Sequence, residues 1–154
     1  WELSGNVTAE TGLPLNINLG GSQGSNGLPN STNRPDVVGG ISYPHTVTNW
    51  FNNAPDASGT CKGTLCQPTL GAWGNLGKGL LRGPGRHNWN ISLFKSFLIN
   101  ETRGSRFELR LETFNAFNHT QFSDVSSTFS NSNFGQVTNT ADPRVLQLGA
   151  KLIF

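Results

Sequence analysis

Long apolar runs, basic clusters and methionine are all missing from this sequence of 154 residues. No stretch approaches the roughly 18 consecutive apolar residues that a membrane-spanning helix needs, and no signal peptide is recognisable. Only 13% of the residues are charged, and the 11 lysines and arginines are scattered, which argues against nucleic acid as a partner. Because Met is absent and Trp1 already lies in a strand-like pattern, we expect the chain to be a piece of a longer protein.

Cysteine is scarce as well, and the two that are present, Cys61 and Cys66, lie close together in the sequence. A local disulfide that closes a small loop is the preferred interpretation, and it predicts an oxidising compartment. The alternative is half of a metal site whose second half is missing. His45, His87 and His119 are isolated and show no ligand spacing. We therefore expect neither a metal ion nor a cofactor.

Apolar residues are thinly spread, at 34% of the chain, whereas Asn, Ser, Thr and the 19 glycines fill long stretches. This composition offers little material for a globular core and favours loops and turns. The strongest pattern is a two-residue alternation of apolar and polar side chains, which predicts strands with two different faces. The alternation occurs in four segments, at about residues 1–10, 89–98, 106–117 and 145–154.

Each of these segments places most of its apolar side chains on one face. The apolar positions are Trp1, Leu3 and Val7; then Trp89, Ile91, Leu93 and Phe97; then Phe107, Leu109 and Leu111; and finally Leu146, Leu148, Ala150, Leu152 and Phe154. Phe94 and Lys95 break the alternation in the second segment. In the third, the opposite face carries Arg106, Glu108, Arg110 and Glu112, whose charges could pair with neighbouring strands across a wet interior.

The connections between the segments alternate in length. Residues 11–88 and 118–144 form long connections, whereas residues 99–105 form a short turn. Outer-membrane barrels have short periplasmic turns and long extracellular loops, and segments of about ten residues match tilted membrane strands. If the short turn is periplasmic, four aromatic residues fall at the periplasmic ends on the apolar side, as an aromatic belt at the membrane interface requires. These are Trp1, Phe97, Phe107 and Phe154.

The sequence therefore predicts an all-β fold of antiparallel up-and-down strands that forms the last part of a transmembrane β-barrel with long extracellular loops. Strands in lipid must pair all round, because no water satisfies their backbone groups there. The smallest such barrels have about eight strands, so four strands need others beside them. The alternative is a soluble secreted β-sandwich that acts as a binding or adhesion module. It explains the alternation and a disulfide, but not the length of the strands or the four aromatic residues.

Three stretches of the chain resemble the end of the Oar-like TonB-dependent receptor family. They are Leu81–Phe97 (LRGPGRHNWNISLFKSF), Phe107–Phe122 (FELRLETFNAFNHTQF) and Phe134–Phe154 (FGQVTNTADPRVLQLGAKLIF), with looser similarity over Trp1–Pro14 and Asn33–Gly40. The resemblance implies a barrel of about 22 strands in the cell outer membrane, filled by an amino-terminal plug. It also implies import of an unknown solute with energy passed on by TonB. The implied partners are outer-membrane lipid, the solute, and TonB through the missing amino-terminal part.

The resemblance further implies a barrel-assembly signal at the end of the chain. Outer-membrane barrels end in a strand with a terminal aromatic residue, which the barrel-assembly machinery reads. The matching positions here are Leu146, Leu148, Leu152 and Phe154, with Ala150 between them. The plainer interpretation is that Phe154 only packs against lipid. The two are compatible, because the machinery would dock this strand by strand pairing.

No catalytic residues are expected, and the chain is not predicted to be an enzyme. The glycine-rich stretch 71–85 lacks the spacing of a phosphate loop and leads into a strand instead of a helix. Glu108 and Glu112 lie beside two arginines, which favours ion pairs facing the barrel lumen over a glycosidase pair. Aromatic residues of the first long connection either hold a sugar or a partner protein or pack the loop against itself, and the sequence leaves this open. They are Tyr43, Trp50 and Phe51.

Overall fold

The computed structural model describes residues 1–21, 27–28 and 33–154, and the chain divides into two compact units. The sheet unit comprises Trp1–Thr11, Arg86–Gln121 and Ala141–Phe154, whereas the loop unit comprises Gly12–Gly85 and Phe122–Thr140. The ordered elements of both units are β-strands. No helix in the described part of the chain is long and apolar enough to cross a membrane.

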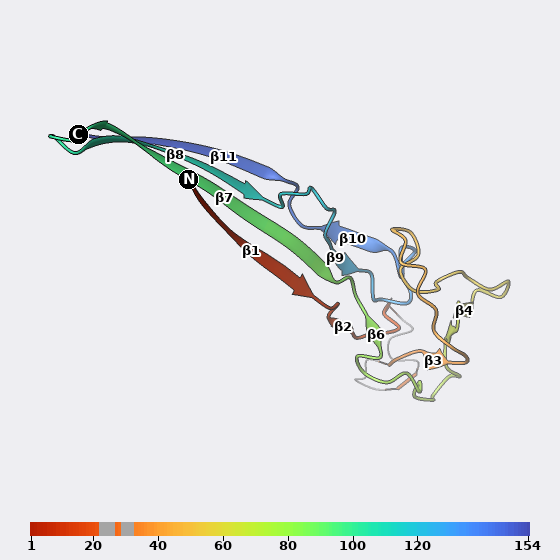
Figure 1. The fold of residues 1–154 in the computed structure, drawn as a ribbon. Helices are drawn as coiled ribbons and strands as arrows, with labels where there is room; N and C mark the ends of the chain where they lie inside the picture. Colours follow the sequence, from red (N-terminus) through yellow and green to blue (C-terminus); the bar gives the residue numbers. More distant parts are fainter. Residues whose placement is uncertain (22–26, 29–32) are drawn as a thin grey trace. The chain divides into compact units, whose positions relative to one another are not determined.

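Four long strands make up the sheet unit, and they lie side by side in the order β1-β7-β8-β11, each antiparallel to the next (Figure 1). Their bounds are Glu2–Glu10 (β1), Arg86–Asn100 (β7), Ser105–Phe114 (β8) and Val145–Ile153 (β11). A tight turn joins β7 to β8, where the Asn100 side chain accepts hydrogen bonds from the amides of Thr102 and Arg103, at 2.9 and 3.2 Å. β1 and β11 are the edges of this sheet, which does not close on itself.

The register of the four strands gives the sheet two chemically different faces. Leu3 of β1 pairs with Leu93 of β7, which pairs with Leu111 of β8, which pairs with Leu148 of β11. One position further along the strands, the corresponding row consists of Ser4, Ser92, Glu112 and Gln147. Since successive side chains of a strand point to opposite sides, leucines cover one face and polar groups the other. We call these the apolar face and the polar face.

The two central strands differ in extent from the sequence-based expectation. β7 begins at Arg86 instead of near Trp89, and β8 ends at Phe114 instead of near residue 117. The earlier end of β8 has a local cause, because Asn115 takes a left-handed backbone with φ of 51°. Its side chain also exchanges two hydrogen bonds of 3.0 Å with the backbone of His119. This asparagine turn takes the backbone groups that a longer strand would have used.

The two long connections fold into the loop unit, whose described residues form seven short strands in three small sheets. The pairs are β2 with β6 and β9 with β10, and the third sheet has the order β3-β5-β4. The bounds are Pro14–Leu15 (β2), Asp36–Val37 (β3), Cys61–Lys62 (β4), Leu65–Cys66 (β5), Leu81–Arg82 (β6), Phe122–Val125 (β9) and Val137–Thr140 (β10). The sequence did not predict these short strands.

A hydrophobic core holds the loop unit together, contrary to the expectation that the chain has little material for one. Its members are Ile17, Leu19, Trp50, Phe51, Leu65, Leu76, Leu81, Val125, Phe129 and Phe134. Phe51 is fully buried and meets Phe134 edge to face, with ring centroids 5.3 Å apart. Trp50 is 9% exposed and donates its indole N–H to the Arg82 carbonyl at 3.0 Å. These aromatic residues therefore pack the loops against themselves.

The glycine-rich stretch that follows residue 70 forms part of this packing. The fully buried Asn33 donates to the Ala72 carbonyl at 2.7 Å and accepts from the Gly74 amide at 3.0 Å. A Cβ atom added at Gly74 would lie 1.8 Å from the Arg34 carbonyl oxygen. Only glycine allows the backbone to approach this closely, which explains one of the glycines by packing and not by phosphate binding.

The β4–β5 hairpin carries the disulfide between Cys61 and Cys66. Donation from the Ser58 hydroxyl and then from the Cys61 amide lowers the pKa of Asp56 at the base of this hairpin. Lys62 reaches from the hairpin to the second long connection, where Nζ donates to the carbonyls of Phe129 and Asn131 at 2.6 and 2.8 Å. Desolvation lowers the pKa of Lys62. The two connections are thus linked by a charge-assisted contact as well as by the core.

Candidate functional site

The apolar face of the sheet unit is widely exposed within the chain. Leu148 and Leu152 of β11 are 71% and 57% exposed, and Leu3 of β1 is 73% exposed. No second sheet of the described sheet unit covers this face. Large apolar side chains that are exposed together on one face of a sheet mark a surface that packs against another apolar medium.

Aromatic side chains gather on the apolar face at the β7–β8 turn. Phe97 pairs with Phe107 across these two strands, with ring centroids 6.1 Å apart. Lys95, which breaks the alternation, places Nζ 4.4 Å from the ring centroid of Trp1 and 4.5 Å from that of Phe97. A lysine between two aromatic rings places its ammonium group over the ring faces while its stem lies along the apolar surface. The exception in the pattern therefore fits an interfacial position.

The polar face carries the charges of β8, and they pair along the strand instead of across it. Arg106 contacts Glu108 at 2.8 Å, and Arg110 contacts Glu112 at 3.7 Å. The charges were expected to pair with neighbouring strands. This expectation is wrong, because both ion pairs of the described residues join positions within β8. Phe94, the second exception in the alternation, lies on this polar face with its ring centroid 5.9 Å from the Arg110 guanidinium.

The residues matched to a barrel-assembly signal lie together on β11. Leu146, Leu148 and Leu152 point to the apolar face, and the terminal Phe154 is 97% exposed. β11 pairs with β8 on one side, and no described strand pairs with its other side. These four residues therefore lie on or next to a strand whose outer edge pairs with no described strand.

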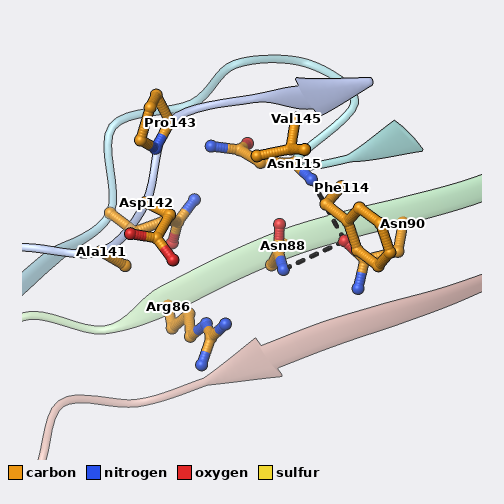
Figure 2. Close-up of a pocket in the computed structure, with 10 residues that line it drawn as sticks. Arg86, Asn88, Asn90, Phe114, Asn115, Ala141, Asp142, Pro143 and Val145 are labelled. Carbon is orange, nitrogen blue, oxygen red and sulfur yellow. Dashed lines mark hydrogen bonds between the residues drawn. The ribbon is translucent and has the colours of Figure 1, made fainter. Parts of the chain in front are cut away.

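A cavity of about 330 Å³ opens on the polar face, at the end of the sheet opposite the β7–β8 turn. Alternate residues of β7 line it together with the end of β8 and the segment ahead of β11 (Figure 2). The side chains that matter below are Arg86, Asn88, Asn90, Phe114, Asp142 and Pro143. Its volume lies within the range of roughly 300–1,000 Å³ that is usual for small-molecule sites.

Two further amides, those of Asn115 and Gln121, build the frame of this cavity. Gln121 Oε1 accepts from the His87 amide at 2.8 Å, while its Nε2 donates to the His87 carbonyl. The Gln121 side chain thereby continues the hydrogen bonding of β7 as a strand neighbour would. Asn115 uses both ends of its amide on the His119 backbone. Both residues are buried, and their polar atoms are consumed by the fold.

Asn88 is the exception among the buried amides of the cavity. Its Nδ2 donates to Asn90 Oδ1 at 3.3 Å, but its Oδ1 accepts no hydrogen bond from any residue that the structure describes. Figure 2 shows this oxygen on the side of the amide away from Asn90. The side chain is 9% exposed. Leaving a buried acceptor without a partner costs about 1–3 kcal/mol, so such an atom points to a ligand position.

Few features of the sequence point to this cavity. Asn90 is a polar position of the alternating segment 89–98, and Asp142 and Pro143 belong to the connection ahead of the last segment. Asp142 and Pro143 line the cavity, whereas Arg144, which follows them, does not. The available signal was the series Arg86, Asn88 and Asn90, three hydrogen-bonding side chains at a spacing of two on one strand face.

Metal binding finds no support in the described part of the chain. The two cysteines are bonded to each other. No three side chains of His, Cys, Asp or Glu gather there into a group that could hold a metal ion. His119 lies exposed in its turn, with Nδ1 2.8 Å from Gln121 Nε2.

Comparison with known proteins gives one match. A family model described as an outer membrane beta barrel domain matches residues 1–147. No curated protein and no solved structure matches the chain. The matched range contains β1, β7 and β8 in full, together with both long connections.

Proposed function

Because the chain belongs to the family of outer membrane beta barrel domains and lies in the outer membrane, we propose that it forms part of the wall of a TonB-dependent receptor that imports a solute. The observation that carries this proposal is the pair of neighbouring rows across the sheet. At one depth, four leucines face one way, and Ser4, Ser92, Glu112 and Gln147 face the other. A wall that separates lipid from a water-filled interior needs one apolar side and one polar side.

The loop unit supports a receptor over a simple pore. Its two long connections are held by a shared core, a disulfide and the Lys62 contacts, and so they form a folded body. Ordered loops of this kind can capture a solute ahead of passage, because binding residues on a rigid scaffold lose little entropy. The motif resemblance to Oar-like receptors points the same way. In this proposal the chain contributes wall and loops, and no catalytic groups.

The partners follow from the two faces and the open edges. Lipid covers the apolar face, and further strands of the same barrel pair with β1 and β11, since four strands cannot close a ring. TonB acts through an amino-terminal part of the full-length protein, and the solute passes on the side of the polar face. Nucleic acid is not a partner in this proposal, because the chain has a net charge of only +2.

The receptor proposal is tested by binding of TonB to the full-length protein. The purified protein in detergent micelles is passed over the immobilised periplasmic domain of TonB, with a porin of similar size as the control. We expect saturable binding of the receptor and none of the porin. Equal signals from both proteins, or no binding by a barrel that is still heat-modifiable on gels, would refute the TonB-dependent role.

We further propose that Leu146, Leu148, Leu152 and Phe154 form the segment that the barrel-assembly machinery reads. Phe154 is 97% exposed, so Phe154→Ala removes almost no packing inside the chain. We therefore expect a several-fold lower amount of assembled, heat-modifiable barrel in outer membranes, with unchanged stability of the protein that does assemble. Ile153→Ala, one residue earlier and on the other face, is the matched control. Equal assembly of both variants and the wild type would remove the signal role.

A further inference from the structure

The cavity on the polar face has a fixed frame and a small set of polar groups that the fold does not use. Asn115 and Gln121 spend both ends of their amides on backbone groups, so they cannot turn towards a ligand. Asn90 Oδ1 accepts from Asn88 and also from the Asn115 amide, at 3.1 Å. The groups that remain include the buried carbonyl oxygen of Asn88, the side-chain nitrogen of Asn90 and the charges of Arg86 and Asp142.

The chemistry of Asn88 restricts what can lie next to it. A side-chain amide oxygen only accepts hydrogen bonds, so the ligand must present a donor there. Carboxylates and the ionised oxygens of a phosphate carry no donor, so they cannot lie against this atom. The Asp142 carboxylate is a counter-charge for an ammonium group, but the Arg86 guanidinium in the same lining opposes a cation, and the amide next to it is uncharged. A hydroxyl group donates one hydrogen bond without a charge, and it is the donor that fits best.

The rest of the cavity is balanced in charge and has an apolar side. Arg86 and Asp142 are both exposed, and neither forms an ion pair with a described residue. One cation and one anion favour a ligand with no net charge that has donors and acceptors on several sides. Phe114 and Pro143 add apolar surface to the lining, against which the C–H groups of a saturated ring can pack (Figure 2).

We propose that this cavity binds a neutral polyhydroxylated molecule, such as a mono- or disaccharide. One hydroxyl donates to Asn88 Oδ1, while neighbouring hydroxyls meet the Asp142 carboxylate and the Arg86 guanidinium. The inference rests on the proposed function, because it names the solute class for that receptor. It does not depend on the loop unit, since every lining residue belongs to the sheet unit.

The test is calorimetric titration of the full-length protein in detergent micelles. The neutral probes are maltose, cellobiose and sucrose; the zwitterion glycyl-leucine and inorganic phosphate represent the competing ligand classes. We expect saturable binding of at least one neutral sugar and none of the other two classes. Binding of glycyl-leucine or phosphate in place of a sugar, or of no probe at all by a folded barrel, would overturn the inference.

Variants of the cavity show whether the sugar binds there. Asn88→Leu keeps the size of the side chain but removes the acceptor, and we expect the affinity to fall about tenfold or more, as loss of one buried hydrogen bond predicts. Asp142→Ala is an exposed change that leaves the fold intact, and it should also weaken binding. Ser96→Ala lies on the same face of β7 near the turn and is the control. Sugar affinity unchanged in both cavity variants would contradict the assignment.

The outcomes separate this inference from the receptor proposal. Sugar binding is measured without TonB, whereas TonB binding is measured without sugar. A protein that binds TonB but no neutral sugar loses only the ligand assignment. A protein that binds sugar through Asn88 but never binds TonB keeps the cavity and loses the energy-coupled transport.

Discussion

Replacing Leu93 with arginine should destabilise the folded barrel in a lipid bilayer by about 2–4 kcal/mol, the usual cost of an arginine on the lipid face near the bilayer midplane. Leu93 lies midway between Trp89 and Phe97, which bracket the apolar face along β7. It pairs with Leu3 on one side and with Leu111 on the other. The new guanidinium would therefore meet only leucines and lipid, with no partner for its five donors.

Ser92→Arg is the matched control, because it introduces the same side chain on the same strand at nearly the same depth. Ser92 points to the polar face and pairs with Ser4 and Glu112. An arginine there meets water and a carboxylate, so we expect a change within about 0.5 kcal/mol. Urea unfolding in large unilamellar vesicles measures both variants. Similar losses in the two would mean that the faces of the sheet do not divide lipid from water.

The fold class and the location were predictable from the sequence because they depend on a periodic signal. Alternation with a period of two determines which residues of a strand share a face. Neighbouring strands then pair in the register that places their leucines on the same face. The family match and the four antiparallel strands confirm an outer-membrane barrel segment. The alternative of a soluble β-sandwich is wrong, because the family match identifies an outer-membrane barrel domain.

Lys95 and Phe94, the two exceptions to the alternation, are explained only by the residues that surround them in the structure. Lys95 is acceptable on the apolar face because Trp1 and Phe97 flank its charge at the turn end of the sheet. Phe94 is acceptable on the polar face because it packs under Arg110. Both contacts join different strands or distant positions, so a pattern read along one segment could not reveal them.

The cavity was beyond prediction because its decisive feature is the absence of a partner. Asn88 and Asn90 look alike in the sequence, as polar positions of one strand. The structure separates them, since Asn90 Oδ1 accepts two hydrogen bonds and Asn88 Oδ1 accepts none from the described residues. The frame that causes this comes from Asn115 and Gln121, whose side chains bond to backbone groups of other residues.

The core of the loop unit was missed for a related reason. Its apolar residues are single and widely spaced, so no window of the sequence shows a period. Ile17, Phe51 and Phe134 come from segments far apart in the chain, and only long-range folding brings them into one cluster. The disulfide reduces the entropy that its segment loses on ordering, and the small sheets satisfy backbone hydrogen-bonding groups of these irregular segments.

Truncating Phe51 to alanine should unfold the loop unit locally while leaving the sheet unit in place. Phe51 is fully buried, meets Phe134 edge to face at 5.3 Å, and lies next to the Trp50 amide that donates to the Gly135 carbonyl at 2.8 Å. Removal of a fully buried phenylalanine costs about 3–5 kcal/mol, because the cavity left behind relaxes only in part.

That cost is large for a unit whose described part has a small core and short strands, so we expect its amides to lose their protection from hydrogen exchange. The Trp50 amide, which bonds to Gly135, and the Leu19 amide, which bonds to the Asn33 carbonyl at 3.0 Å, report on the loop unit. The paired amides of β7 and β8 report on the sheet, and they should exchange as in the wild type. Leu13→Ala, at a loop-unit position that is 79% exposed, is the control and should change the free energy of unfolding by no more than about 0.5 kcal/mol.

If Phe51→Ala left the Trp50 and Leu19 amides protected, the loop unit would owe its order to something other than this core. If it released the amides of β7 and β8 as well, the sheet could not serve as a wall that holds its shape independently of the loops.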